Sequence, residues 1–204
     1  MVGISVATRF RRTAIAAIAL AAAVPVAAQD FSNSYTFIKA VKDRDGDKVT
    51  SLLTTPGSTV GSAKEQGSGN GALHLVTLDR DANWLRFLIS RGMKVDARNG
   101  RGDSALSLAA QLGWLEGAQV LLGKSASVDL ANGRGETPLI LAVQKRDLAM
   151  VRLLLSRGAD PKRSDSVAGY SALDYAKRDG RSASIVKLLE APREAARKVQ
   201  GPGL

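Results

Sequence analysis

Residues 132–143 read NGRGETPLILAV, and residues 99–110 read NGRGDSALSLAA, 33 positions earlier. Each stretch has a Gly-rich turn followed by an apolar run. Two similar apolar runs occur elsewhere, GALHLV from position 71 and SALDYA from position 171, so that the four runs start at positions 71, 104, 137 and 171. Self-similarity at a nearly constant interval predicts an array of equivalent structural units.

A second apolar block follows each of these runs at a similar distance. The blocks are LRFLI from position 85, AQVLL from 118, VRLLL from 151 and IVKLL from 185. The pattern predicts two short helices and a turn in every unit. One such unit is too small to bury its own apolar face, so the units are expected to stack on one another.

The unit at residues 135–160, GETPLILAVQKRDLAMVRLLLSRGAD, gives the pattern its clearest form. On this motif and on the interval between the runs, the sequence resembles the ankyrin-repeat family over about residues 35–191. The resemblance implies an all-α fold, an ankyrin-repeat solenoid of stacked helix-turn-helix units. A generic helical array is the alternative.

Local residue chemistry agrees with this arrangement. The hydroxyl of Thr137 suits a helix N-cap, and Pro138 suits the first helical position, where no N–H is needed. Gly92 and Gly158 can close the second helix of their units in a left-handed conformation. Ser125 occupies the equivalent position in the middle unit, a departure expected to cost about 1 kcal/mol. Gly71 is a weak N-cap, which predicts that its unit frays first.

Polar residues at otherwise apolar positions mark the two ends of the array. Lys39 and Ser51 near the N-terminal end, and Lys177 and Lys187 near the C-terminal end, replace residues that are apolar in the inner units. Terminal repeats with polar outer faces are typical of such arrays. The predicted division is a signal peptide (1–28), an N-terminal capping repeat (30–65), three ankyrin repeats (66–98, 99–131 and 132–165), a C-terminal capping repeat (166–191) and a flexible tail (192–204).

The N-terminus has the order of a secretory signal. A basic segment, MVGISVATRFRR, precedes the apolar segment TAIAAIALAAAV, and Pro25 and the small residues VAA follow. This predicts cleavage after Ala28 and a periplasmic or secreted protein. The apolar segment is short for a bilayer span, which needs roughly 20 residues, so an uncleaved anchor is the less favoured alternative. Arg11 and Arg12 leave twin-arginine export open, although their flanks favour ordinary export.

Charge and composition exclude several kinds of function. The net charge of +10 falls to +7 without the three arginines of the leader, and the surplus is spread along the chain. Aromatic residues make up 4% of the chain. Clustered cations with stacking aromatics are typical of nucleic-acid binding, which is therefore not expected. There is no cysteine, so disulfides and thiol chemistry are excluded.

Catalytic and metal-binding motifs find little support. His74 is the only histidine, and it matches the histidine of the family's Thr-Pro-Leu-His pattern, which implies a structural role. A hydrolase built on His74 is the less favoured alternative. Asp43, Asp45 and Asp47 suggest a calcium loop, but an EF-hand needs a glycine where Lys48 stands and a glutamate where Thr54 stands. No enzyme activity, metal or cofactor is expected.

The resemblance implies binding instead. In ankyrin-repeat proteins, partners contact the turn tips and the exposed side of the first helices. Arg101 with Asp103, and Arg134 with Glu136, are interpreted as polar specificity pairs beside apolar anchors. The candidate partner-binding residues are Asn70, Leu78, Asp79, Arg98, Arg101, Asp103, Gln111, Leu112, Arg134, Glu136, Gln144, Lys145, Tyr170 and Arg178.

The predicted function is therefore that of a non-catalytic protein–protein interaction module of the bacterial cell envelope. The alternative is electrostatic association of the basic chain with an anionic envelope surface, such as lipid headgroups or a wall polymer. Salt dependence distinguishes the two, because adsorption to a charged surface is lost at high ionic strength.

Overall fold

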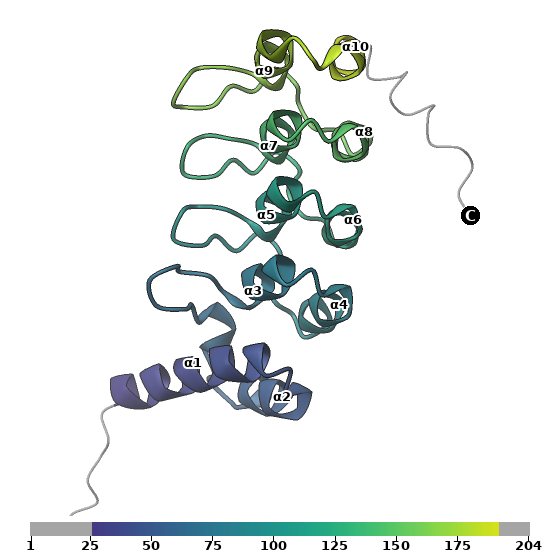
Figure 1. Cartoon of the computed structure of the whole chain (residues 1–204). Helices are drawn as coiled ribbons and strands as arrows, with labels where there is room; N and C mark the ends of the chain where they lie inside the picture. Colours follow the sequence, from purple (N-terminus) through teal and green to yellow (C-terminus); the bar gives the residue numbers. More distant parts are fainter. Residues whose placement is uncertain (1–25, 192–204) are drawn as a thin grey trace, which may run out of the picture.

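A computed structural model describes residues 26–191, with side chains from residue 32 onward. Within this range the fold is all-α, and pairs of helices stack in a single row (Figure 1). The predicted helical solenoid is confirmed. Its elements are α1 (Val26–Lys42), α2 (Gly46–Thr54), the 3-10 helix η1 (Val60–Ser62), α3 (Ala72–Leu78), α4 (Ala82–Ser90), α5 (Ala105–Leu112), α6 (Leu115–Gly123), α7 (Pro138–Gln144), α8 (Leu148–Ser156), α9 (Ala172–Asp179) and α10 (Ala183–Glu190).

Three of the first helices, α5, α7 and α9, begin at hydroxyl caps. Ser104, Thr137 and Ser171 each accept a hydrogen bond from the backbone N–H of the third residue after them. Pro138 is the first residue of α7. A cap of this kind satisfies one of the backbone donors that a helix N-terminus leaves without a partner.

The core runs through the row as two layers of helices. Helices α3, α5, α7 and α9 form one layer, and α4, α6, α8 and α10 form the second layer beside it (Figure 1). Leu75, Leu108 and Leu141 are buried at equivalent places in successive units, with exposed fractions of 7%, 2% and 6%. Burial of one such side chain contributes about 2 kcal/mol, and stacking of the neighbouring unit is needed to complete that burial.

The two ends of the row carry the polar residues. The side chains of Lys39 on α1 and Lys177 on α9 are exposed, and they pair with Asp43 and Glu190 at 2.5 and 2.8 Å. Ser51 and Lys187 are exposed as well. Lysine and serine therefore lie where a further unit would otherwise cover an apolar side chain.

The middle unit differs from the others where the sequence departs from the pattern. Ser125 adopts a φ of +62°, whereas the equivalent glycines have φ values of +84° at Gly92 and +90° at Gly158. A left-handed conformation costs a residue with a Cβ about 1 kcal/mol.

The predicted leader and tail lie mostly outside the described residues. Residues 1–25 and 192–204 are not described, and the predicted cleavage position after Ala28 falls in the first turn of α1. Among residues 26–191, no helix is long and apolar enough to span a bilayer.

Candidate functional site

A hollow of about 700 Å³ lies between the two central turns and the helices α5 and α7. We call it the central groove. Its walls come from two consecutive units, so it exists only because those units stack. Its lining residues are Arg101, Asp103, Gln111, Leu112, Asn132, Gly133, Arg134, Glu136, Leu141, Gln144 and Lys145.

The turns beside the groove are joined to one another by their backbones. These turns form the tip edge, which comprises the loops 64–71, 97–104, 130–137 and 164–171; the loops project from one side of the helices (Figure 1). Gly100 N donates to Ser68 O at 3.1 Å, and Gly133 N donates to Arg101 O at 3.0 Å. A Cβ on Gly133 would lie 2.6 Å from Arg101 O, so this close approach requires glycine.

Two buried asparagines hold the shape of these turns. Asn99 Oδ1 accepts from the backbone N–H groups of Arg101 and Asp103, each at 2.9 Å. Asn132 Oδ1 accepts in the same way from Arg134 and Glu136, at 2.9 and 3.0 Å. The repeated geometry gives the two central turns the same form, so Arg101 and Arg134 occupy equivalent positions.

The amide of Asn132 also links the two central turns. Its Nδ2 donates to Asp103 Oδ1 at 3.1 Å and to Glu136 Oε2 at 3.0 Å. Gln111 Nε2 donates to the same Asp103 Oδ1, 3.2 Å away, and Gln144 Nε2 donates to Glu136 Oε1 at 3.2 Å. Asp103 is thus bonded by amides from both units, and Glu136 is bonded by two amides of its own unit.

The two members of each predicted specificity pair, Arg101 with Asp103 and Arg134 with Glu136, differ in burial. Asp103 and Glu136 are 2% and 5% exposed, whereas the side chains of Arg101 and Arg134 are 72% and 67% exposed. Arg101 Nε donates to Asp103 Oδ2 at 3.0 Å, and Arg134 Nε lies 3.8 Å from Glu136 Oε2. The interpretation of both members as surface devices is corrected here: the acid supports the turn and the arginine faces solvent.

Eight of the fourteen predicted residues line the central groove, and the others lie elsewhere. Asn70 is buried and its Oδ1 accepts from Asn99 Nδ2 at 3.0 Å, which makes it part of the turn framework. Leu78 is 42% exposed at the end of α3, and Asp79 follows it. Arg98 is exposed, and its Nη1 donates to Gly102 O at 3.3 Å. These residues do not line the groove.

Tyr170 and Arg178 form a separate pair at the C-terminal end of the row. Arg178 Nη1 donates to the Tyr170 hydroxyl at 2.6 Å, and the guanidinium carbon lies 4.5 Å from the ring centroid. Tyr170 also packs edge-on against Tyr175, with ring centroids 5.6 Å apart. The pair continues the tip edge and α9 beyond the groove without lining it.

Asn132, Gly133 and Leu141 line the groove but were not among the predicted site residues. The sequence carried a signal for Asn132, because Asn99 occupies the same place in the preceding unit and Asp165 occupies it in the following unit. Leu141 was interpreted as a core residue only, and at 6% exposure it contributes the apolar floor of the groove.

The comparison with protein families distinguishes the predicted ankyrin repeats from a generic helical array. The family described as ankyrin repeats (many copies) matches residues 120–176. Residues 120–176 therefore carry ankyrin repeats. The matched range includes part of the second helix of the middle unit and both helices of the next unit. A comparison with curated proteins gives no match. Ankyrin repeats generally mediate protein–protein interaction and are not catalytic.

The opposite ends of the first helices form a second edge of the stack. We call it the helix-turn edge; it comprises the turns 43–45, 79–81, 113–114, 145–147 and 180–182. Five equivalent residues here are left-handed, with φ between +54° and +66°. They are Arg44, Arg80, Gly113, Arg146 and Gly180.

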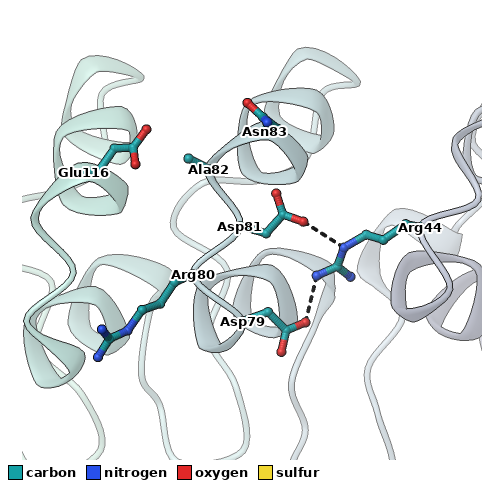
Figure 2. A pocket seen from close by; sticks show the side chains of 7 residues that line it. All are labelled: Arg44, Asp79, Arg80, Asp81, Ala82, Asn83 and Glu116. Carbon is teal, nitrogen blue, oxygen red and sulfur yellow. Dashed lines mark hydrogen bonds and ion pairs between the residues drawn. The ribbon is translucent and has the colours of Figure 1, made fainter.

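The three left-handed arginines of this edge reach into the next unit. Arg44 Nη2 donates to Asp79 at 2.8 Å and its Nε donates to Asp81 at 3.0 Å (Figure 2). Arg80 Nη2 donates to Leu112 O at 2.8 Å, and Arg146 forms a two-point pair with Asp179.

These contacts shift the ionisation of the groups involved. The pKa of Asp81 is lowered, first by the backbone N–H of Trp84 and then by Arg44. The pKa of Asp179 falls to about 2, mainly because of its hydrogen bonds from Arg146 and Ser182. The hollow at Asp79, Asp81 and Glu116 is therefore walled by groups that already serve unit–unit contacts.

His74 has the structural role that the ankyrin resemblance implied. Its Nδ1 accepts from Gly71 N at 3.1 Å, and its Nε2 lies 2.9 Å from Asp103 O in the next unit. The ring thereby supplies one half of a capping box, the bond from the N-cap N–H to the third residue after it, whereas Gly71 has no side chain for the other half. Burial lowers the pKa of His74, although backbone hydrogen bonds oppose this shift.

The aspartates that suggested a calcium loop lie around the start of α2. Asp45 Oδ1 accepts from Lys48 N at 2.9 Å and caps α2, and Asp43 pairs with Lys39. Among residues 32–191, no three His, Asp or Glu side chains lie together in a way that could hold a metal ion.

Proposed function

We propose that the chain binds a partner protein in the central groove and acts without catalysis in the bacterial cell envelope. The central groove carries the proposal. It combines exposed cations, amide donors and an apolar floor on a rigid framework of two stacked units. A concave surface shared by neighbouring repeats is the form in which stacked units present an extended binding site.

The polar network favours a preformed site. Asp103 and Glu136 are held by amides and backbone turns, so a partner would meet fixed donors and anchors and would order few of them on binding. Preorganisation of this kind raises affinity by lowering the entropy lost on association. The envelope location is supported by the leader pattern, a basic segment and then an apolar one, that ends at Ala28.

Site-specific crosslinking tests the groove. A photoreactive amino acid placed at Gln111 or Gln144 lies in the groove, and one placed at Arg152 on α8 serves as the matched outer control. After irradiation of bacteria that express the chain, we expect a discrete protein adduct from the two groove positions and none from the outer position. Equal adducts from all three positions would contradict the groove assignment.

Two further measurements test the location and the alternative. Mass spectrometry of the exported chain is expected to find Gln29 at its N-terminus. Release of the chain from envelope fragments is then followed as salt is raised. Complete release without any crosslinked protein would support adsorption to an anionic surface, since exposed charges are screened beyond about 10 Å at 0.1 M salt.

A further inference from the structure

The two central tips present cations whose own acids face inward. The Nε atoms of Arg101 and Arg134 face the carboxylates of Asp103 and Glu136. Both arginine side chains are largely exposed, and their terminal Nη groups are not part of these pairs. Lys145, at the C-terminal end of α7, is exposed and also lines the groove. The outward face of the groove is therefore cationic, although its lining includes two carboxylates.

The arginine pair is confined to the two central units. The equivalent tip positions are Ser68 in the preceding unit and Val167 in the C-terminal unit. The outer tips thus lack a charge at this position. This confinement distinguishes the pair from the surplus of positive charge that is spread along the chain.

The spacing of the pair is fixed by stacking. The tips are joined through Gly133 N and Arg101 O at 3.0 Å, and packed helices lie about 8–10 Å apart. A chain in the polyproline II conformation has three residues per turn and rises about 9 Å per turn. Its side chains three residues apart therefore point the same way at about the interval between equivalent tips.

We propose that the central groove binds an extended acidic segment of a protein, in which carboxylates three residues apart pair with Arg101 and Arg134. A guanidinium engaged at Nε still offers its two Nη groups, which suit a carboxylate. The side chains between the two carboxylates would face Leu112 and the apolar floor at Leu141. The proposal rests on the groove being a protein-binding site.

Labelled synthetic peptides test the register. One peptide carries two glutamates three residues apart in a Pro- and Ala-rich segment. A second peptide of the same composition carries them side by side, and a third replaces both with glutamine. Fluorescence anisotropy is recorded with the exported full chain. We expect the first peptide to bind at least about tenfold more tightly than the other two.

Variants of the chain separate this register from charge in general. The double change Arg101→Gln with Arg134→Gln removes the tip pair, and Arg152→Gln with Arg157→Gln removes the same charge from the exposed side and C-terminal end of α8. The tip variant is expected to lose the preference for the first peptide, while the outer variant keeps it. Equal binding of the two acidic peptides would overturn the proposal and indicate attraction by charge alone.

A third variant keeps this test apart from the test of the proposed function. Leu112→Gln makes an apolar part of the groove lining polar without changing the charge, and thermal unfolding checks that each variant remains folded. If the crosslinked partner is lost in Leu112→Gln but kept in the tip variant, the groove binds protein and the acidic register is wrong. If neither change affects the partner, the groove assignment fails as well.

Discussion

Arg44 and Arg101 lie on opposite edges of the same stack and are engaged differently. Arg44 spans two units through Asp79 and Asp81, and its side chain is only 25% exposed. Arg101 pairs within its own turn and is 72% exposed. The helix-turn edge therefore uses arginine to connect units, whereas the tip edge leaves arginine facing solvent.

The backbone explains this difference. At the tip edge, neighbouring units are connected by main-chain hydrogen bonds such as Gly133 N to Arg101 O, and glycines allow the approach. At the helix-turn edge, side chains such as those of Arg44 and Arg146 make the connection. Where the backbone contributes to the joining of the units, the arginine side chains remain exposed to solvent.

Gly102→Ala tests the backbone connection and has the largest expected effect. Gly102 has a φ of +79°, and a Cβ would lie 2.6 Å from Gly133 N. The left-handed conformation and the backbone clash together are expected to lower the free energy of unfolding by about 2–4 kcal/mol. Urea unfolding measures it.

Gly158→Ala is the matched control for this change. Gly158 has a φ of +90°, but a Cβ there would have no neighbour within 4 Å. Only the conformational cost of about 1 kcal/mol is expected. If the two variants were equally stable, the close backbone contact at the tip edge would not contribute to stability. The proposed difference between the two edges would then be wrong.

His74→Ala sharpens the comparison because His74 connects the first and second tips through a side chain. Loss of its contacts with Gly71 and Asp103 is expected to cost about 2 kcal/mol at about pH 7.5, since two buried backbone groups lose their partner. Urea unfolding again provides the measurement.

The same variant gives a pH test. The pKa of His74 is lowered in the folded protein, so its unfolded form, with a pKa of about 6.5, binds the proton more tightly. The stabilisation is complete above about pH 6.5 and decreases as pH falls toward the folded pKa. Wild type should lose stability between about pH 7.5 and 5.5, and His74→Ala should not. An NMR titration midpoint of this single histidine at or above 6.5 would contradict the expectation.

Arg44→Ala tests the side-chain connection of the helix-turn edge. The change removes the bonds to Asp79, Asp81 and Val41 O and a contact 5.5 Å from the Trp84 ring. We expect a loss of about 1–2 kcal/mol. Arg101→Ala, on the other edge, should cost less than Arg44→Ala, because it removes one bond within a turn and Asp103 keeps its bonds from Gln111 and Asn132. Equal losses at the two positions would mean that both edges depend on arginine in the same way.

The fold was predictable because it depends on a repeated pattern. The interval between apolar runs, the caps at Ser104 and Thr137, and the closing glycine at Gly158 are local signals, and each acts over a short stretch of chain. Stacking then follows, because neither helix pair can bury its apolar face alone. The general position of the groove follows from the same periodicity.

The distribution of burial within the site was not predictable from the same signals. Asp103 and Glu136 look like surface acids in sequence, and only the fold shows that Asn132 and the glutamines enclose them. The left-handed Arg44 gave no local signal either, because its partners Asp79 and Asp81 belong to the next unit. Contacts between units depend on geometry that a single repeat does not contain.

Arg146 gives the finest test of the helix-turn edge, because two effects of opposite sign act on one residue. Its φ of +57° favours glycine, while its pair with Asp179 favours arginine. The equivalent residue of the preceding unit is Gly113, which has a φ of +65° and no side chain with which to make this connection. Arg146→Gly should thus change the midpoint of thermal unfolding by no more than about 2–3 °C.

Arg146→Ala isolates the two effects. Alanine loses the ion pair and keeps the conformational cost, so this variant should melt below Arg146→Gly. Between about pH 4 and 2, wild type should lose more stability than either variant, because the depressed pKa of Asp179, about 2, stabilises the fold above pH 3.8 and this contribution disappears as pH falls toward 2. If Arg146→Ala melted at a higher temperature than Arg146→Gly, the left-handed backbone at this edge would impose no conformational cost. The ion pair of Arg146 with Asp179 would then have no such cost to offset.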